Sequence, residues 1–350
     1  MPEYLSPGVY VEEVDTGNKP IEGVATSTVG FLGVAERGPR EPMLVTSFTE
    51  YARLYGRYNK PSVLAYAVEG FFLNGGKRCF IARVASKTAV AAKKASANLT
   101  VSAIGPGTWA NNRVAFKISA CGQEDPNQPA TQQMFRLTVM FWDARVNLPQ
   151  PIVDPTDITK LTDPNRREPT IIEQYDNLST DPLSTSFCER QINGASAIVT
   201  VALAGNNRPG NTNALQLLAG GTDGAALDLT DFKGDPTALP GTTTGLLAFQ
   251  EIDEIAILCC PDEYYPGPTS GKIAGDLVAQ CELLKDRFVI LQASNAAVPV
   301  QNIFPSQATK YAAYYYPWIN ITDPVTDQAL QIPPGGHVAG IYARSDTERG

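Results

Sequence analysis

The chain has a single histidine, His337, among its 350 residues, and no excess of basic side chains. Its 28 Lys and Arg are outnumbered by 36 Asp and Glu, which gives a formal charge of -8. Nucleic-acid affinity rests on clustered basic side chains that neutralise phosphates, so we expect no nucleic-acid partner.

Catalytic signatures are scarce as well. Acyl-transfer enzymes need a nucleophile, a base that is usually histidine, and a group that orients the base. His337 lies in a Pro- and Gly-rich turn, and no G-x-S-x-G motif occurs. Paired acids such as Asp262 and Glu263 are interpreted as solvated charges. We therefore expect no enzymatic activity and no catalytic residue.

Clustered metal ligands are also missing. The six cysteines are dispersed, no C-x-x-C pair occurs, and His337 is the only imidazole. Zinc sites need clustered thiolates or imidazoles, so we expect no metal site and no cofactor. The cysteines are interpreted as reduced, mostly buried residues. Cys259 and Cys260 end an apolar run, where neighbouring side chains point to opposite faces of a strand.

Targeting and membrane segments are not evident. The N-terminus MPEYLSPGVYVEE has neither a basic start nor the apolar core of a secretion signal. No uninterrupted apolar run of about 18 residues is present, so we expect no membrane insertion. We expect the protein to be made soluble in a cytoplasm.

Apolar patterning and turn residues divide the chain into four regions. Residues 1–20 contain one extended strand, and residues 21–96 alternate strands and helices. Residues 97–220 carry short β segments separated by polar and Pro-rich loops, which is typical of a sandwich. Residues 221–350 return to an α/β pattern, which favours a parallel sheet. The β-rich region therefore reads as a module inserted into an α/β core.

Several elements can be placed individually. A helix with a Ser or Thr cap is expected from Ser47, and a second helix over 61–73 that ends in left-handed geometry at Gly75-Gly76. Residues 338–343 (VAGIYA) are interpreted as a strand-like run with no terminal helix after it. Other strands and helices are expected at Arg78 to Val84, Ile255 to Leu258, 272 to 285, and Arg287 to Leu291.

The first strand has no hairpin partner nearby in the sequence. Such a strand either joins a distant sheet of its own chain or pairs with another molecule, because its N–H and C=O groups are unpaired. The pattern leaves both options open. The alternating residues of this arm are Val9, Tyr10, Val11 and Val14, and Gly17 and Asn18 follow it as a candidate hinge.

An aromatic run near the C-terminal end offers two further interpretations. As a packed strand, its rings would lie at a domain or subunit contact. As an exposed platform, they would stack on sugars or bases in a ligand-binding protein. For the chain as a whole, a degenerate or unrecognised hydrolase that uses its α/β core on peptides or glycans is the alternative function. The run comprises Tyr311, Tyr314, Tyr315, Tyr316 and Trp318.

Nine blocks of sequence, in order along the whole chain, resemble the contractile tail sheath family of bacteriophages and related injection particles. They are YLSPGVYVEEV (4–14), STVGFLGVAERGP (27–39), FFLNGGKRCFIARV (71–84), IGPGTWANN (104–112), EQYDNLS (173–179), LLAGGTDG (217–224), TGLLAF (244–249), AAYYYPWINITDP (312–324) and IPPGGHVAGIYARSDTERG (332–350).

The resemblance implies a subtilisin-like α/β core without a catalytic triad, an N-terminal linking arm and a β-sandwich-like domain. It implies a homo-oligomer of six-membered rings stacked helically around an inner tail tube protein, with baseplate and tail terminator proteins as further partners. Contraction would drive the tube through a target envelope. The expected location is a virion tail or phage-like particle that is assembled in the bacterial cytoplasm. In that family a C-terminal domain follows the last block, so we expect this chain to be incomplete as a sheath subunit.

Overall fold

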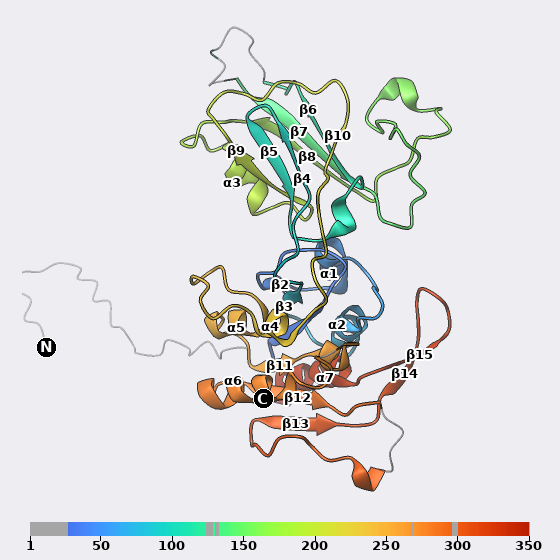
Figure 1. The fold of residues 1–350 in the computed structure, drawn as a ribbon, viewed down its shortest axis with the longest axis vertical. Helices are drawn as coiled ribbons and strands as arrows, with labels where there is room; N and C mark the ends of the chain where they lie inside the picture. Colours follow the sequence, from blue (N-terminus) through green and yellow to red (C-terminus); the bar gives the residue numbers. More distant parts are fainter. Residues whose placement is uncertain (1–26, 124–128, 130–132, 268, 296–299, 350) are drawn as a thin grey trace, which may run out of the picture.

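The computed structural model describes residues 27–349 except 124–128, 130–132, 268 and 296–299. Two parts stand one above the other (Figure 1). We call the lower part the α/β core, built from residues 27–84 and 229–349. The upper part, residues 93–217, is the β module. The chain crosses between them twice.

A six-stranded sheet forms the centre of the α/β core, in the order β13-β12-β11-β1-β3-β2. Every neighbouring pair is parallel except β2 with β3. The expected parallel sheet is therefore present. The first described strand, β1, lies inside the sheet. Strands β2 and β3 lie on one side of it, and the later strands β11, β12 and β13 lie on the other. The strands are β1 (Val29–Val34), β2 (Met43–Val45), β3 (Cys79–Val84), β11 (Ile257–Cys259), β12 (Phe288–Gln292) and β13 (Ala312–Tyr315).

Each face of this sheet is covered by helices. The face of Val29 and Phe31 packs against α1 (Phe48–Tyr55), α2 (Leu64–Leu73) and α7 (Gly335–Arg349). The opposite face packs against α4 (Leu229–Lys233), α5 (Gly245–Ala248) and α6 (Ala274–Leu284).

The adjacent cysteines illustrate these two faces. Cys259 belongs to the first apolar cluster and Cys260 to the second. The prediction that they point to opposite faces is thus confirmed.

Local signals place the early helices well. The Ser47 hydroxyl accepts a hydrogen bond from the Glu50 amide at 3.2 Å and caps α1, as the sequence predicts. After α2, Gly75 has a φ of +100°, which is the left-handed geometry expected there. The strands and the helix predicted between residues 255 and 291 correspond to β11, α6 and β12.

The prediction of a strand-like run at 338–343 is wrong, because these residues belong to helix α7. The reason is close packing of α7 on α2. A Cβ atom on Gly336 would lie 2.3 Å from the carbonyl oxygen of Ala67, and one on Gly340 would lie 2.4 Å from that of Phe71. Glycines one turn apart let the two backbones approach, and apolar residues around them resemble a strand in sequence.

Two antiparallel sheets build the β module, in the orders β10-β6-β7-β8 and β4-β5-β9. Their inner faces share one apolar cluster, which also takes in α3, so the arrangement is sandwich-like. The elements are β4 (Lys93–Ser96), β5 (Leu99–Ala103), η1 (Thr108–Ala110), β6 (Val114–Ser119), β7 (Phe135–Phe141), η2 (Ile158–Lys160), β8 (Ile171–Leu178), α3 (Cys188–Asn193), β9 (Val199–Leu203) and β10 (Gln216–Leu217).

The aromatic run forms the edge strand β13 and the segment after it. Tyr314 packs on the face covered by α6, whereas Tyr315 packs on the other face and its hydroxyl contacts that of Tyr342. The Trp318 indole donates to the Ala293 carbonyl at 2.7 Å. Because the rings lie on both faces of the sheet, they do not form one stacking platform.

Beyond β13, two strands leave the sheet. β14 (Ile319–Thr322) and β15 (Ala329–Ile332) pair with each other as an antiparallel ribbon. The ribbon projects from the core (Figure 1). Short 3-10 turns complete the core: η3 (Phe249–Glu251), η4 (Pro261–Tyr264) and η5 (Val300–Asn302).

Candidate functional site at the junction of the two parts

The two crossings between the core and the β module are paired with each other. The outward crossing follows β3, and the return crossing leads to α4. The Val90 and Thr222 backbones exchange hydrogen bonds of 3.0 and 2.9 Å, and the Lys93 amide donates to the Ala219 carbonyl at 2.9 Å. The junction is therefore a short antiparallel ribbon instead of two independent linkers.

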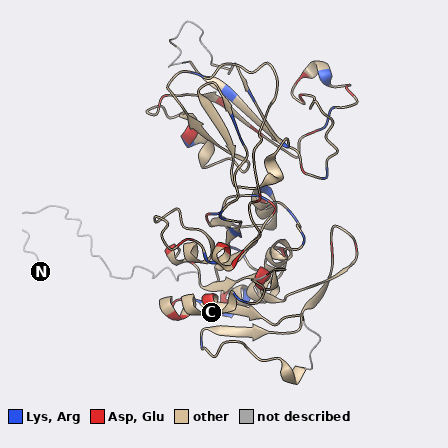
Figure 2. Cartoon of the chain, in the orientation of Figure 1, with Lys and Arg blue, Asp and Glu red and all other residues tan. Residues whose placement is uncertain are grey.

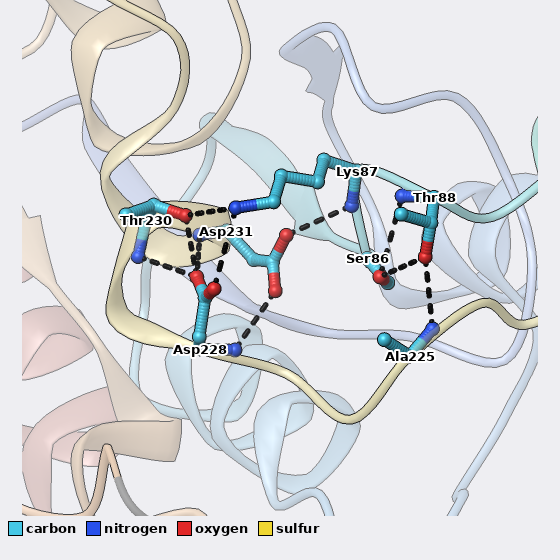
Figure 3. Close-up of polar contacts among 7 residues, drawn as sticks. All are labelled: Ser86, Lys87, Thr88, Ala225, Asp228, Thr230 and Asp231. Atoms are coloured by element: carbon cyan, nitrogen blue, oxygen red, sulfur yellow. Dashed lines mark hydrogen bonds and ion pairs between the residues drawn. The ribbon is translucent and has the colours of Figure 1, made fainter.

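A polar clamp holds this ribbon on the core (Figure 3). The Lys87 amide donates to the Asp231 carboxylate at 2.8 Å, and the Lys87 ammonium contacts Thr230 at 3.1 Å and Asp228 at 3.4 Å. The Ala225 amide donates to the Thr88 hydroxyl at 2.9 Å. Asp228 also caps α4, so the clamp anchors the return crossing to the first turn of that helix.

Basic side chains of the core also reach into the β module, and blue segments meet at the junction in Figure 2. The Arg53 guanidinium pairs with the buried Glu173 carboxylate of β8 at 3.1 Å. The Arg37 guanidinium lies 4.8 Å from the centre of the Phe141 ring of β7. The contact between the two parts is therefore largely polar, which is typical of interfaces between domains.

Arg83, near the end of β3, is another buried basic group of the junction. Its Nε donates to the Ala35 carbonyl, and its Nη1 donates to the carbonyls of Gly38 and Pro106. Burial lowers the pKa of Arg83 to about 10. Beside it lies a cavity of about 730 Å³, lined from the core by residues such as Lys60 and from the module by Trp109.

Two buried carboxylates follow β11. Asp262 accepts hydrogen bonds from the amides of Val34 and Val63 at 2.7 and 2.8 Å, and from the Ser62 hydroxyl at 2.7 Å. It ties the end of β1 to the start of α2, whose N-cap residue, Val63, offers no side-chain acceptor. Glu263 accepts from the Gln292 amide at 3.1 Å.

The interpretation of this acidic pair as solvated is wrong, since each residue is only 3% exposed. Burial without a cationic partner raises the pKa of Asp262 to about 6 and that of Glu263 to about 8. The sequence did hold a signal: Asp262 and Glu263 directly follow an apolar strand, where the carboxyl end of a buried sheet continues into covered loops.

His337 belongs to α7, and its imidazole ring packs against α2. A Cβ atom on Gly70 would lie 2.3 Å from its ring, so the imidazole fills the space that Gly70 leaves open. Burial lowers the pKa of His337, and its Nδ1 has no hydrogen-bond partner among the described residues. The imidazole packs between two helices, and no hydroxyl nucleophile is hydrogen-bonded to it in the described part of the chain.

Within the described ranges, no group of three or more His, Cys, Asp and Glu residues could hold a metal ion. No described helix is both long and apolar enough to cross a membrane.

The arm residues and hinge predicted from sequence lie outside the described residues. They are Val9, Tyr10, Val11, Val14, Gly17 and Asn18. Sequence reasoning did not find the junction residues Lys87, Arg83 and Asp231. Their contacts join residues 144 positions apart in one case and 23 in another, so no local pattern marks them.

No protein-family model matches the chain, and no curated protein matches it either. The chain is similar to solved sheath structures. One is a sheath tail protein from Desulfitobacterium hafniense, with 13% identity, a TM-score of 0.45, and coverage of 96% of this chain and 61% of that protein. Another is a sheath tail protein from Listeria innocua, with 10% identity, a TM-score of 0.46, and coverage of 92% and 56%.

A third is the helical sheath of the anti-feeding prophage in its contracted state. It shows 16% identity and a TM-score of 0.41, and the match covers 99% of this chain and 54% of that protein. This chain therefore spans between 54% and 61% of the length of the three structures.

Proposed function

We propose that this chain is a structural subunit of a contractile tail sheath and has no catalytic activity. The observation that carries the proposal is the joint order of nine sequence blocks along the whole chain, which resemble that family. Each block is short, but their order from residue 4 to residue 350 is specific.

The positions of these blocks in the fold support the proposal. In the block at 104–112, a Cβ atom on Gly105 would lie 1.9 Å from the Gly38 carbonyl oxygen of the core. In the block at 217–224, one on Gly221 would lie 2.3 Å from the Gly107 carbonyl oxygen. The glycines of these blocks are therefore required where the core and the β module meet, so the resembling segments specify how the two parts join.

The assembly follows from the same proposal. Subunits form six-membered rings that stack helically around an inner tube protein, between a baseplate and a terminator, in a phage tail or related particle. Contraction changes one subunit packing for another of lower free energy while the subunits move nearly as rigid bodies. The parallel core sheet, with helices on both faces, is then the subtilisin-like domain of the family.

Linkage between subunits depends on the arm, residues 1–20, with Gly17-Asn18 as its hinge. Extended arms can add a strand to an exposed sheet edge. Among the sheet edges of the described structure, β13 is a terminal strand of the core sheet, and β14–β15 is a ribbon of only two strands. The alternating Val9, Val11 and Val14 suit this pairing.

The domain division is part of the proposal. Residues 21–96 and 221–350 would form the core of the subunit, and residues 97–220 an outward β domain that folds on its own apolar cluster. Joining residue 96 to residue 222 tests this division. A soluble product with a cooperative thermal transition is expected, whereas a molten product would show that the two parts share a core.

The arm can be tested in the assembled particle by a strand-breaking substitution. Val11→Pro removes one backbone N–H from the arm, so we expect it to abolish striated sheaths in electron micrographs. Glu12→Gln keeps the backbone donors and is the matched control, for which normal sheaths are expected. Sheaths of normal length from Val11→Pro would contradict the linking role, and loss of sheaths in both variants would show an effect unrelated to strand pairing.

The hydrolase alternative is not favoured by the site geometry. The His337 ring fills the space beside Gly70, and its Nδ1 has no hydrogen-bond partner among the described residues. Generic peptide and glycan substrates should give no turnover. Turnover that disappears in His337→Ala would revive the hydrolase.

A further inference from the structure

The junction cavity lies where the fold of the α/β core favours ligand binding. β3 and β11 lie on either side of β1, so the order of the sheet reverses at β1. In open α/β sheets, ligands bind outside the carboxyl ends of the strands at such a reversal. Residues directly after β1, β3 and η4 line the cavity, among them Ala35, Ala85 and Tyr265.

The volume fits a small organic molecule. At about 730 Å³ the cavity lies within the range of ligand pockets, and it lies between two domains, where such pockets are common. Aromatic and aliphatic side chains of both parts form its walls. The aromatic wall residues are Trp109, Phe141 and Tyr265.

Arg83 gives the cavity one unused donor group. The side chain is 6% exposed, and three of its five N–H groups are bound to carbonyls. Its Nη2 group makes no hydrogen bond to any described residue, and no described carboxylate lies within ion-pair distance of it. A Cβ atom on Gly107, which lines the cavity, would lie 3.5 Å from this Nη2.

Each of the other charged side chains of the cavity wall has a polar partner in the protein. Lys60 pairs with Asp323 at 2.8 Å. Asp223 accepts from the Thr108 amide and hydroxyl at 2.8 and 2.7 Å, and Glu36 accepts from the Arg57 amide at 3.2 Å. Among the two basic wall residues, Arg83 is therefore the one that has no acidic partner among the described residues.

The net charge of the cavity wall limits the net charge that a ligand can carry. Two basic residues, Lys60 and Arg83, balance two acidic ones, Glu36 and Asp223. A ligand with one negative charge leaves a single excess charge in the occupied site. A dianion such as a phosphate monoester leaves two and is repelled by both carboxylates.

From this geometry we infer that the junction cavity is a binding site for a small monocarboxylate with a planar, apolar body, whose carboxylate accepts hydrogen bonds from Nη2 of Arg83. The guanidinium and the carboxylate are complementary in shape and charge. The apolar body lies against the aromatic wall. This site is independent of the proposed sheath function.

Phenylacetate is the probe, and three indole N–H resonances report its position. The indole of Trp109, a residue of the cavity wall, donates to the Gly105 carbonyl, whereas those of Trp142 and Trp318 donate to the carbonyls of Arg167 and Ala293 elsewhere. In a titration of the full chain, we expect a saturable shift of the Trp109 resonance alone. Phenylacetamide, the neutral isostere, and phenyl phosphate, the dianion, should each bind at least about tenfold more weakly.

Two substitutions test the charge argument in opposite directions. Arg83→Met should weaken phenylacetate binding by about tenfold or more, because it removes the cationic donor. Asp223→Asn removes a repelling charge and should strengthen binding by about threefold or more. If Arg83→Met fails to fold, Asp223→Asn still tests whether charge controls phenylacetate binding.

Several outcomes would overturn the inference. Equal binding of phenylacetamide and phenylacetate would show that the carboxylate makes no contact with a cation. If all three indole resonances shift, phenylacetate does not bind specifically at the junction. If no resonance shifts up to the solubility limit of phenylacetate, the junction does not bind it. Unchanged affinity in a folded Arg83→Met, or weaker binding in Asp223→Asn, would also contradict it.

Discussion

The buried acid Glu263 makes the stability of the α/β core depend on pH, and Glu263→Gln should remove that dependence. In the folded chain, burial raises the pKa of Glu263 from 4.5 to about 8. Between these values the unfolded chain releases a proton that the folded chain retains. The free energy of unfolding therefore falls as the pH rises, and the contribution of this group is complete only below pH 4.5.

The magnitude follows from the size of the pKa shift. One pH unit inside the window changes the free energy of unfolding by about 1.4 kcal/mol. From pH 6 to pH 8 the wild type should lose about 2 kcal/mol through Glu263, allowing for partial ionisation near the upper value. Asp262, with a pKa raised to about 6, acts mainly below this interval.

The variant keeps the contacts and loses only the titration. A glutamine at position 263 has the same shape and still offers an acceptor to the Gln292 amide, so the packing around β12 should persist. Urea unfolding at pH 6, 7 and 8, followed by circular dichroism, gives the required free energies. The advantage of Glu263→Gln over the wild type should grow by about 2 kcal/mol across this range.

A matched control separates burial from charge. Glu282 is exposed on α6, so Glu282→Gln should change the free energy of unfolding by the same amount at all three pH values. If the difference between Glu263→Gln and the wild type stays constant from pH 6 to pH 8, the carboxylate is solvated or paired, and the reasoning from its burial is refuted.

Three further predictions concern packing and the junction. Gly336→Ala should lower the free energy of unfolding by about 3 kcal/mol in a urea titration, because its Cβ atom would meet the Ala67 backbone. Gly275→Ala is the control: the nearest atom to its Cβ would be 3.6 Å away, so this variant should be neutral or stabilising in the same titration. Arg53→Ala should cost about 1 kcal/mol and increase amide exchange around Glu173, since it leaves a buried carboxylate without its cation. Lys87→Ala should cost less than about 0.5 kcal/mol by thermal melting, because the exposed ammonium contributes little and the backbone bond to Asp231 persists.

Local signals made much of the α/β core predictable. Ser47 has a hydroxyl that accepts from the third residue of its helix, and Gly75 adopts the left-handed geometry that other residues avoid. The apolar runs that became β3, β11 and β12 are short and bounded by turn residues, as buried parallel strands are. Each of these features depends on neighbours within about five positions, which is the range that sequence patterns report.

Features that depend on distant partners were not predictable. The sequence of helix α7 resembles a strand because its small residues interrupt the usual helical pattern. These residues are needed for close packing on α2, which lies more than 260 positions earlier in the chain. The burial of Asp262 depends on amides at Val34 and Val63, which approach only once β1 and α2 are in place. The junction cavity needs side chains from both parts of the molecule, and no single segment carries its pattern.

The place where the β module enters the core has a mechanical consequence. The chain leaves at the carboxyl end of β3 and returns to α4, and β1 separates β3 from β11, the next core strand. The module therefore interrupts no hydrogen-bonded ladder of the core sheet. The module is joined to the core by the Val90–Thr222 ribbon and the clamp at Asp231, and by side-chain contacts such as the Arg53–Glu173 pair and Arg37 on Phe141. Because these contacts are largely polar, we expect the module to be able to move relative to the core while the core sheet stays intact.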